Sequence, residues 1–186
     1  MNNGSVSGDD VPPLVREALS LADRAGFEKS CSPGTGRLLH VFAAQVRQGR
    51  IGELGTGSGV GAAWIASALE PDAELVTVEH DDLLARRNAE LFGDLANVTV
   101  IAGDWSELAA LAPFDLLFCD TVVPKLEEVD ATVAMLAMGG MIVLDDYRGL
   151  GRVGDSPRNA WLHHPHLVAT EVLVSDAEAV VVAVRR

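Results

Sequence analysis

Apolar residues recur at helical spacing in the first part of the chain. In residues 14–25 they stand three or four positions apart, and Pro12 and Pro13 precede them, where a helix start favours proline. A polar segment, residues 26–33, separates this stretch from a second one with the same spacing, Gly34 to Gln48, which stops before Gly49. We therefore expect two N-terminal helices within residues 12–48.

From residue 50 onward, short apolar runs alternate with amphipathic stretches. The runs have the length and composition of buried strands, whereas the stretches between them have the period of helices. The expected strands are Arg50–Gly55, Glu74–Glu79, Val98–Ala102, Phe114–Asp120 and Met141–Asp145, and the expected helices are Gly59–Leu69, Asp82–Leu95, a short turn near Glu107, and Lys125–Ala137. Because helical crossovers join parallel strands, this order predicts an α/β fold, a Rossmann-like three-layer sandwich with a mostly parallel sheet.

The end of the chain departs from this alternation. Two apolar runs, His166–Val174 and Ala179–Val184, are separated by only four residues, so we expect them to pair as an antiparallel hairpin. Three histidines near its start, His163, His164 and His166, are expected in a solvated turn rather than in a metal site. No repeat or change of composition divides the sequence, and we expect a single domain over residues 1–186 with a disordered tail at 1–11.

The formal net charge of −13 narrows the choice of partner. Such a field repels phosphate backbones and anionic lipid headgroups, which argues against nucleic acid or a membrane surface as the partner. The first residues lack the basic and apolar regions of a signal peptide, and Cys31 and Cys119 fit no metal or redox spacing. We expect a cytoplasmic protein that acts on a small molecule. The sequence leaves the oligomeric state open, a homodimer included.

Acidic residues at strand ends are the first candidates for a site. In an open parallel sheet, ligands bind beyond the carboxyl ends of the strands. Asp115 begins its expected strand and Asp120 ends it, about 16 Å away at roughly 3.3 Å per residue. We therefore expect Asp120 at the site and Asp115 in a structural role.

The first expected strand leads into a glycine-rich loop, Gly55-Thr56-Gly57-Ser58-Gly59, and a helix follows at once. The glycines allow a tight turn and close approach of a ligand to the backbone, and the helix start behind them offers unpaired N–H groups. The next strand ends in Glu79, about 20 residues beyond the loop, where an acid is placed to accept hydrogen bonds from ribose hydroxyls. His80 beside it is a candidate for the same pocket.

Three features favour S-adenosylmethionine over a nicotinamide dinucleotide. Glu53 puts a carboxylate just before the glycines, where it would repel a pyrophosphate and attract the ammonium group of a methionine. The third strand leads into Asp104 and Trp105, a carboxylate and an aromatic plane that suit adenine. The chain also closes with a hairpin rather than with a further βαβ unit.

Two other classes of protein stay open at this point. Gly57, Gly59 and Ala62 match the G-x-G-x-x-A pattern of dinucleotide binding, so an NAD(P)-dependent oxidoreductase is one alternative. Such an enzyme needs an acid/base group such as a Tyr-Lys pair, and the only tyrosine, Tyr147, has no lysine near it in sequence. The other alternative is a non-catalytic protein of the same fold that binds S-adenosylmethionine.

This ordered set of residues resembles the class I S-adenosylmethionine-dependent methyltransferases, in particular the small bacterial O-methyltransferases similar to catechol and caffeoyl-CoA O-methyltransferases. The resemblance runs from about Ser32 to Arg186 and includes the lead-in 32–36 and the segment 139–146. It implies a seven-stranded sheet whose last strand is antiparallel, and methyl transfer to a hydroxyl oxygen of a small molecule. The residues expected to bind the cofactor are Glu53, Gly55, Thr56, Gly57, Ser58, Gly59, Glu79, His80, Asp104, Trp105 and Asp120.

In the metal-dependent relatives, the positions of Asp120, Asp145 and Asp146 supply the ligands of a divalent cation. Oxygen ligands favour Mg²⁺, Mn²⁺ or Ca²⁺, and such a cation would lower the pKa of an acceptor hydroxyl. Asp120 is therefore expected to act in catalysis. The third ligand of these relatives is usually Asn, and their lysine after the first ligand is displaced here to Lys125. The alternative is that Arg148 neutralises the carboxylates and that no metal is needed.

Overall fold

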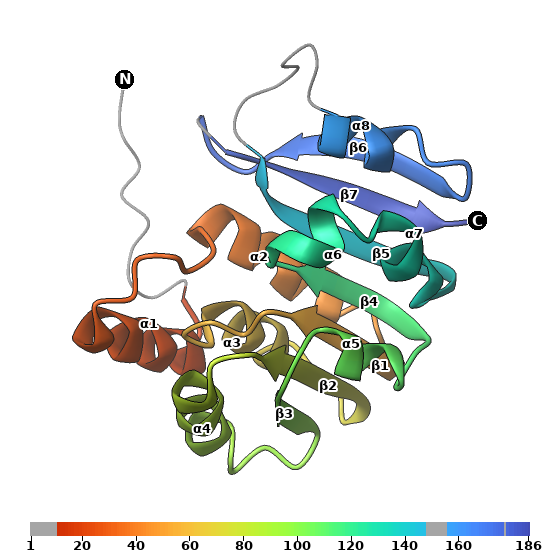
Figure 1. The fold of residues 1–186 in the computed structure, drawn as a ribbon. Coiled ribbons are helices and arrows are strands. Elements are labelled where there is room, and N and C mark those ends of the chain that lie inside the picture. The colour runs from red at the N-terminus through yellow and green to blue at the C-terminus, as the bar shows by residue number, and fades with distance from the viewer. Residues whose placement is uncertain (1–10, 148–155, 177) are drawn as a thin grey trace.

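A seven-stranded sheet forms the centre of the computed structural model, which describes residues 11–147, 156–176 and 178–186 (Figure 1). Its spatial order is β3-β2-β1-β4-β5-β7-β6. The strands are β1 (Gln48–Leu54), β2 (Asp72–Glu79), β3 (Val98–Ala102), β4 (Phe114–Cys119), β5 (Leu136–Tyr147), β6 (Leu167–Leu173) and β7 (Ala179–Arg185). β1 to β5 pair in parallel, and β7 pairs antiparallel with both β5 and β6. The predicted mostly parallel sheet with an antiparallel terminal hairpin is confirmed.

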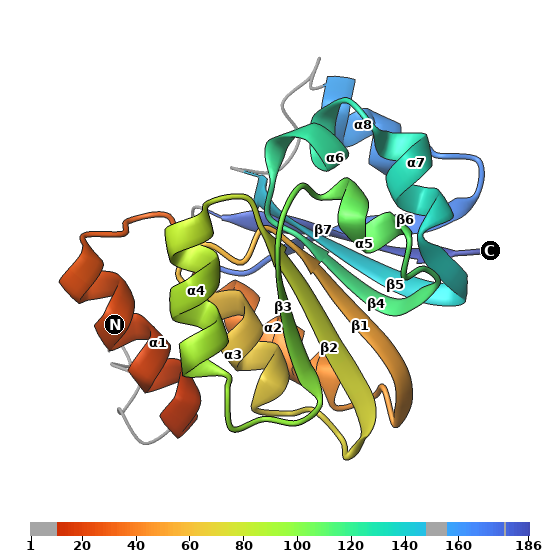
Figure 2. The same ribbon diagram turned by 60° about the horizontal axis from the view of Figure 1, so that its bottom comes forward.

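Helices cover both faces of the sheet, as Figure 2 shows from a second direction. One face carries α1 (Pro13–Ala25), α2 (Pro33–Ala43), α3 (Val60–Ala66) and α4 (Asp82–Leu91), and the other carries α5 (Ser106–Ala109), α6 (Val122–Leu126), α7 (Val129–Ala134) and α8 (Ser156–Leu162). Because side chains alternate along a strand, β4 contributes Leu116 and Phe118 to the first core and Leu117 and Cys119 to the second. The three-layer sandwich is confirmed, and Cys119 is a fully buried thiol.

The predicted helix Lys125–Ala137 is wrong. Two short helices, α6 and α7, replace it, and β5 already begins at Leu136, which pairs with Phe114 of β4. Strand pairing with β4 ends the helical segment before Leu136, and contacts between the two short helices fix their arrangement. The Thr132 hydroxyl is buried and donates to the Pro124 and Glu128 carbonyls, which holds the end of α6 against α7.

Other differences from the predicted elements are smaller. The second helix ends at Ala43 rather than Gln48, because Gln48 pairs with Asp72 as the first residue of β1. α8 was not predicted. The three-histidine turn is only partly solvated, since His164 is buried and its Nε2 lies 2.9 Å from Asp130 Oδ1, whereas His163 and His166 are exposed.

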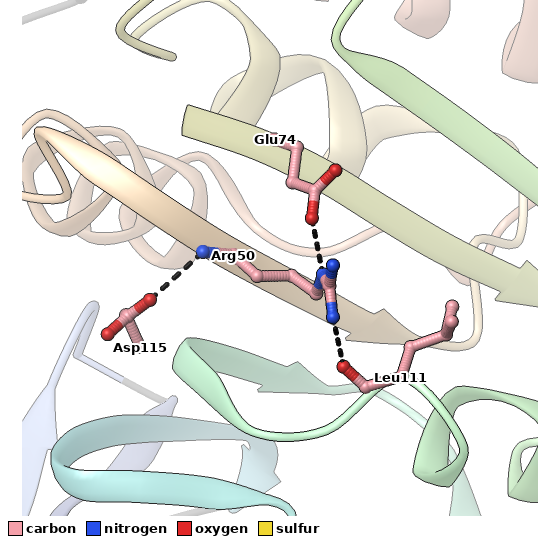
Figure 3. A network of polar contacts seen from close by, with 4 residues as sticks. All are labelled: Arg50, Glu74, Leu111 and Asp115. Carbon is pink, nitrogen blue, oxygen red and sulfur yellow. Dashed lines mark hydrogen bonds and ion pairs between the residues drawn. The ribbon is translucent and has the colours of Figure 1, made fainter. Parts of the chain in front are cut away.

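The amino ends of the central strands are held together by Arg50 of β1 (Figure 3). Its side chain donates to Glu74 on β2 and to the Leu111 carbonyl, and its backbone N–H donates to Asp115 Oδ2 at 2.9 Å. This contact needs Gly49, because a Cβ there would lie 2.2 Å from the same carboxylate oxygen. Asp115 therefore has the predicted structural role, at the end of the sheet opposite to Asp120.

Candidate active site

A cavity of about 830 Å³ opens beyond the carboxyl ends of β1 to β5. The register of these parallel strands aligns the residues that line this cavity. Leu54 of β1 pairs with Val78 and Cys119, and Cys119 pairs with Leu144, so the next residue of each strand stands in one row. That row contains Gly55, Glu79, Asp120 and Asp145, and all four line the cavity. The chain reverses its direction of winding between β1 and β4, which is where open α/β sheets bind ligands.

The glycine-rich loop forms one wall of the cavity. Gly55, Gly57 and Gly59 all adopt left-handed conformations, with φ of 93°, 54° and 85°, which side-chain-bearing residues rarely adopt. The N–H groups of Gly55 and Thr56 donate to the Val78 carbonyl, which ties the loop to the end of β2. Gly55 also lets β4 approach, since a Cβ there would lie 3.2 Å from the Asp120 carbonyl oxygen.

Glu79 connects the glycine-rich loop to the turn that follows β2. Its Oε2 accepts the Gly57 N–H at 2.6 Å and its Oε1 accepts the Asp81 N–H at 2.9 Å. The carboxylate therefore stands at the glycine loop with both oxygens fixed by backbone donors. His80 beside it is exposed and lines the same cavity.

Asp104 and Trp105, the residues expected at the adenine, line the cavity next to β3. Gly103 positions them, because its N–H donates to the Glu79 carbonyl at 2.9 Å. Asp104 Oδ1 accepts the Ser106 N–H at 3.0 Å, and this hydrogen bond is the main cause of a lowered pKa at Asp104. The carboxylate is thus ionised at neutral pH beside an aromatic ring.

Glu53 does not face the cavity, contrary to the prediction. Its side chain is 1% exposed, lies below the loop against α3, and accepts a hydrogen bond from the Thr77 hydroxyl at 2.5 Å. Burial is the main cause of a pKa raised to about 8, so the carboxyl group is mostly neutral at physiological pH. The expected attraction between a Glu53 carboxylate and an ammonium group therefore has no basis in this position.

Three further predicted residues hold the loop rather than line the cavity. Thr56 is buried, with its hydroxyl 2.5 Å from that of Thr77, and the Ser58 hydroxyl lies 2.8 Å from that of Ser30. Gly59 ends the loop against α4, where a Cβ would lie 2.3 Å from Asn88 Oδ1. None of the three belongs to the lining of the cavity among the described residues.

Asp120 and Asp145 come together at the far side of the glycine loop. Asp145 is 6% exposed, and its Oδ1 accepts a hydrogen bond from Thr35 of α2 at 3.1 Å. Lys125, 7% exposed, donates its ammonium to the Asp145 carbonyl oxygen at 3.0 Å, so the displaced lysine does approach this edge of the sheet.

The predicted metal-ligand set is only partly described. The side chain of Asp146 and all of Arg148 lie outside the described residues. In the part of the chain that the structure describes, no three His, Cys, Asp or Glu side chains form a group that could hold a metal ion. The described residues therefore supply two of the three predicted carboxylates.

Sequence reasoning missed much of the cavity's outer wall. The missed lining residues are Phe27, Glu28, Lys29, Ser30, Cys31 and Ser32 from the α1–α2 loop, Thr121, Val122 and Val123 from the start of α6, and Glu178 from the β6–β7 hairpin. The only sequence signal for them was the lead-in at residues 32–36. In it Ser32 caps α2 by accepting the Thr35 N–H. In the described residues no helix has the length and apolarity to cross a bilayer.

Comparisons with known proteins agree with this geometry. The sequence profile of a methyltransferase domain family matches residues 53–147. A catechol O-methyltransferase of Mycobacterium tuberculosis is 28% identical over 163 residues, which cover 83% of this chain and 73% of that protein. A protein of Mycobacteroides abscessus named as an O-methyltransferase is 30% identical over 165 residues, with coverage of 84% and 74%.

A solved structure shares the fold. The O-methyltransferase TomG of Streptomyces achromogenes, involved in tomaymycin synthesis and solved with S-adenosylmethionine, superposes with a TM-score of 0.76 at 22% identity over 94% of this chain and 90% of that one. The oxidoreductase and the non-catalytic alternatives are not favoured by these matches. The chain belongs to the class I S-adenosylmethionine-dependent methyltransferases, among the small O-methyltransferases.

Proposed function

We propose that the enzyme transfers the methyl group to a hydroxyl oxygen of a small molecule, bound where β4 and β5 end. One observation carries this proposal: a single cavity joins the glycine loop to Asp120 and Asp145, which stand at matching positions on neighbouring parallel strands. An oxygen acceptor needs its proton removed or its hydroxyl polarised before it attacks, and carboxylates beside the reacting atom suit that task.

The cofactor fits the half of the cavity formed by β1, β2 and β3. Gly55 and Gly57 line this half of the cavity, and glycine backbone allows close approach of a ligand, which suits the methionine part of S-adenosylmethionine. Glu79 is placed for the ribose hydroxyls, and Asp104 and Trp105 for the adenine. When bound, the cofactor supplies an electrophilic methyl group on its sulfonium.

The acceptor then occupies the other half of the cavity, beyond the carboxyl ends of β4 and β5. Methyl transfer is an in-line displacement, so the protein mainly has to align the acceptor oxygen with the methyl group. Asp120 stands in the row between Gly55 and Asp145 and is the residue that we assign to acceptor alignment. Val122 and Val123 at the start of α6, 59% and 39% exposed, offer an apolar wall for the body of the acceptor.

A divalent cation is part of this proposal. Asp120, Asp145 and Asp146 would hold it, and it would lower the pKa of the acceptor hydroxyl. The two described carboxylates support this assignment because they stand at matching positions of adjacent strands and line the same cavity. Lys125 provides a second positive charge at the same edge.

Mass spectrometry of a reaction with S-adenosylmethionine and a catechol tests the proposal, since a relative acts on that class of compound. We expect one methyl group on an oxygen, formed at least about a hundredfold more slowly by Asp120→Asn, because one removed catalytic interaction typically costs that much. Asp115→Asn, at the opposite end of the same strand, is the matched control and should retain the rate. Transfer only to nitrogen or sulfur acceptors would contradict the proposal.

A further inference from the structure

The order of the strands divides the charged residues of the cavity into two groups. Glu79 ends β2 and Asp104 stands just beyond β3, on the cofactor side of β1. Asp120 directly follows β4 and Asp145 lies near the carboxyl end of β5, on the opposite side of β1. Glu178 joins this second group, because Ala179 pairs with Tyr147 near the end of β5. The acceptor half is therefore bordered by a carboxylate that belongs to the terminal hairpin.

Several backbone contacts fix the position of Glu178. Its N–H donates to the Ser175 hydroxyl at 3.1 Å, and its carbonyl accepts the N–H groups of Val174 and Ser175 at 3.0 and 3.3 Å. The hairpin in turn lies against the start of α2, where a Cβ on Gly34 would be 2.2 Å from the Val174 carbonyl oxygen. This close approach brings the hairpin to the wall that contains Ser32 and Cys31.

The ionisable groups of the cavity are mostly acidic. The described lining residues include a single lysine, Lys29, and one histidine, His80. Lys29 and its sequence neighbour Glu28, which also lines the cavity, carry opposite charges. Among the described residues of the lining, the carboxyl groups are those of Glu28, Glu79, Asp104, Asp120, Asp145 and Glu178. A cation held by Asp120 and Asp145 would leave Glu178 uncompensated, because its described polar contacts are to the neutral groups of its own turn.

We infer that this enzyme selects methyl acceptors that are neutral or positively charged and rejects those that carry a carboxylate or phosphate near the reacting hydroxyl, and that Glu178 is a specificity-determining residue for this choice. The inference rests on the proposed function, since it assumes that the acceptor occupies the β4–β5 half of the cavity. A like charge within about 5 Å at the dielectric of a protein surface weakens binding by roughly tenfold or more.

The test uses two catechols that share the ring, one with an aminoethyl and the other with a carboxyethyl side chain. Calorimetry at neutral pH in the presence of S-adenosylhomocysteine gives both dissociation constants, so the comparison does not depend on turnover. We expect the ammonium compound to bind at least about tenfold more tightly. Glu178→Gln should remove most of this preference and Glu178→Lys should reverse it. Asp176→Asn is the matched control, because Asp176 is an exposed carboxylate of the same hairpin outside the cavity lining, and it should keep the full ratio.

Three results would overturn the inference: equal or tighter binding of the carboxylate compound, no measurable binding of the ammonium compound, or an unchanged ratio in Glu178→Gln. Failure of the proposed function looks different. In that case the ammonium compound binds with the expected preference, yet no methyl group reaches its hydroxyl oxygens when S-adenosylmethionine replaces S-adenosylhomocysteine.

Discussion

Two glutamates on β2 have opposite roles because they stand at opposite ends of the strand. Glu74 near the amino end pairs with Arg50, whereas Glu79 at the carboxyl end holds the Gly57 and Asp81 N–H groups beside the cavity. The rule that ligands bind beyond the carboxyl ends of strands therefore distinguishes the structural carboxylates Glu74 and Asp115 from Glu79 and Asp120, which line the cavity. The rule gives the wrong position for Glu53, because the burial of this side chain depends on the packing of α3.

We expect Glu79→Ala to weaken S-adenosylmethionine binding at least about tenfold. A hydrogen bond to a charged group contributes about 1.5–3 kcal/mol, and the variant also releases the Gly57 N–H from its partner. Calorimetric titration measures the dissociation constant. Glu74→Ala, which removes a carboxylate from the other end of the same strand, is the control and should bind the cofactor normally. Equal affinities for both variants would exclude Glu79 from the cofactor site.

Glu53 makes stability depend on pH in an unusual direction. Burial raises its pKa to about 8 in the folded chain from an ordinary value of 4.5, so the folded state keeps a proton that the unfolded chain releases. The contribution to stability is therefore fully present below about pH 4.5 and is lost as the pH rises toward 8. Within that window the loss is about 1.4 kcal/mol for each pH unit.

Glu53→Gln tests this directly. Gln stays neutral and can still accept the Thr77 hydroxyl hydrogen bond, so the variant should unfold at a nearly constant urea concentration from pH 5 to about pH 8. For the unaltered protein, the urea concentration at the midpoint of unfolding should fall over the same pH range. Parallel pH profiles for the two proteins would mean that Glu53 ionises normally in the fold.

At the scale of elements, the glycine loop combines two requirements, a left-handed backbone and open space for a ligand. Gly57→Ala imposes the backbone cost, since φ is 54°, and also places a Cβ 3.0 Å from the Phe27 ring, so that this wall of the cavity has to shift. Gly139→Ala imposes only the first, because φ is 80° and no atom lies within 4 Å of its Cβ position. Each should lose about 1–2 kcal/mol of stability.

Only Gly57→Ala should also weaken cofactor binding. Urea unfolding measures the shared backbone cost, and calorimetry with S-adenosylmethionine measures the difference between the two variants. Similar cofactor affinity in both would show that the cofactor does not approach Gly57.

The sequence predicts best the elements that a local hydrophobic pattern defines. It predicts least well the elements whose geometry depends on contacts between distant parts of the chain. β3 begins and ends as predicted, because five apolar and β-branched residues stand between turns. α6 and α7 could not be separated from the local pattern, since their geometry depends on Thr132 and on the Trp161 indole, which donates to the Lys125 carbonyl from 36 residues away. The same limitation hid Glu178, which reaches the cavity only through strand pairing.

At the scale of the whole molecule, the sheet brings together carboxylates that are far apart in sequence. Asp120 and Asp145 stand side by side at the carboxyl edge of β4 and β5, and Thr35 of α2, 110 residues before Asp145, donates to its carboxylate. With a net charge of −13 the chain does little to relieve the repulsion between them. Lys125 and a divalent cation are the two sources of positive charge that the sequence and structure suggest at this edge.

Chelation distinguishes these two sources. If a cation is required, excess chelator should abolish methyl transfer to a hydroxyl acceptor, and Mg²⁺ or Mn²⁺ should restore it. S-adenosylmethionine binding should change little, because Glu79 ends β2, on the other side of β1 from β4 and β5. Asp145→Ala should reproduce the effect of the chelator and resist rescue by added metal, whereas Asp176→Asn should respond like the unaltered enzyme. Full activity in excess chelator would instead assign the compensating charge to the protein, and Lys125→Met should then lose the activity that chelation leaves intact.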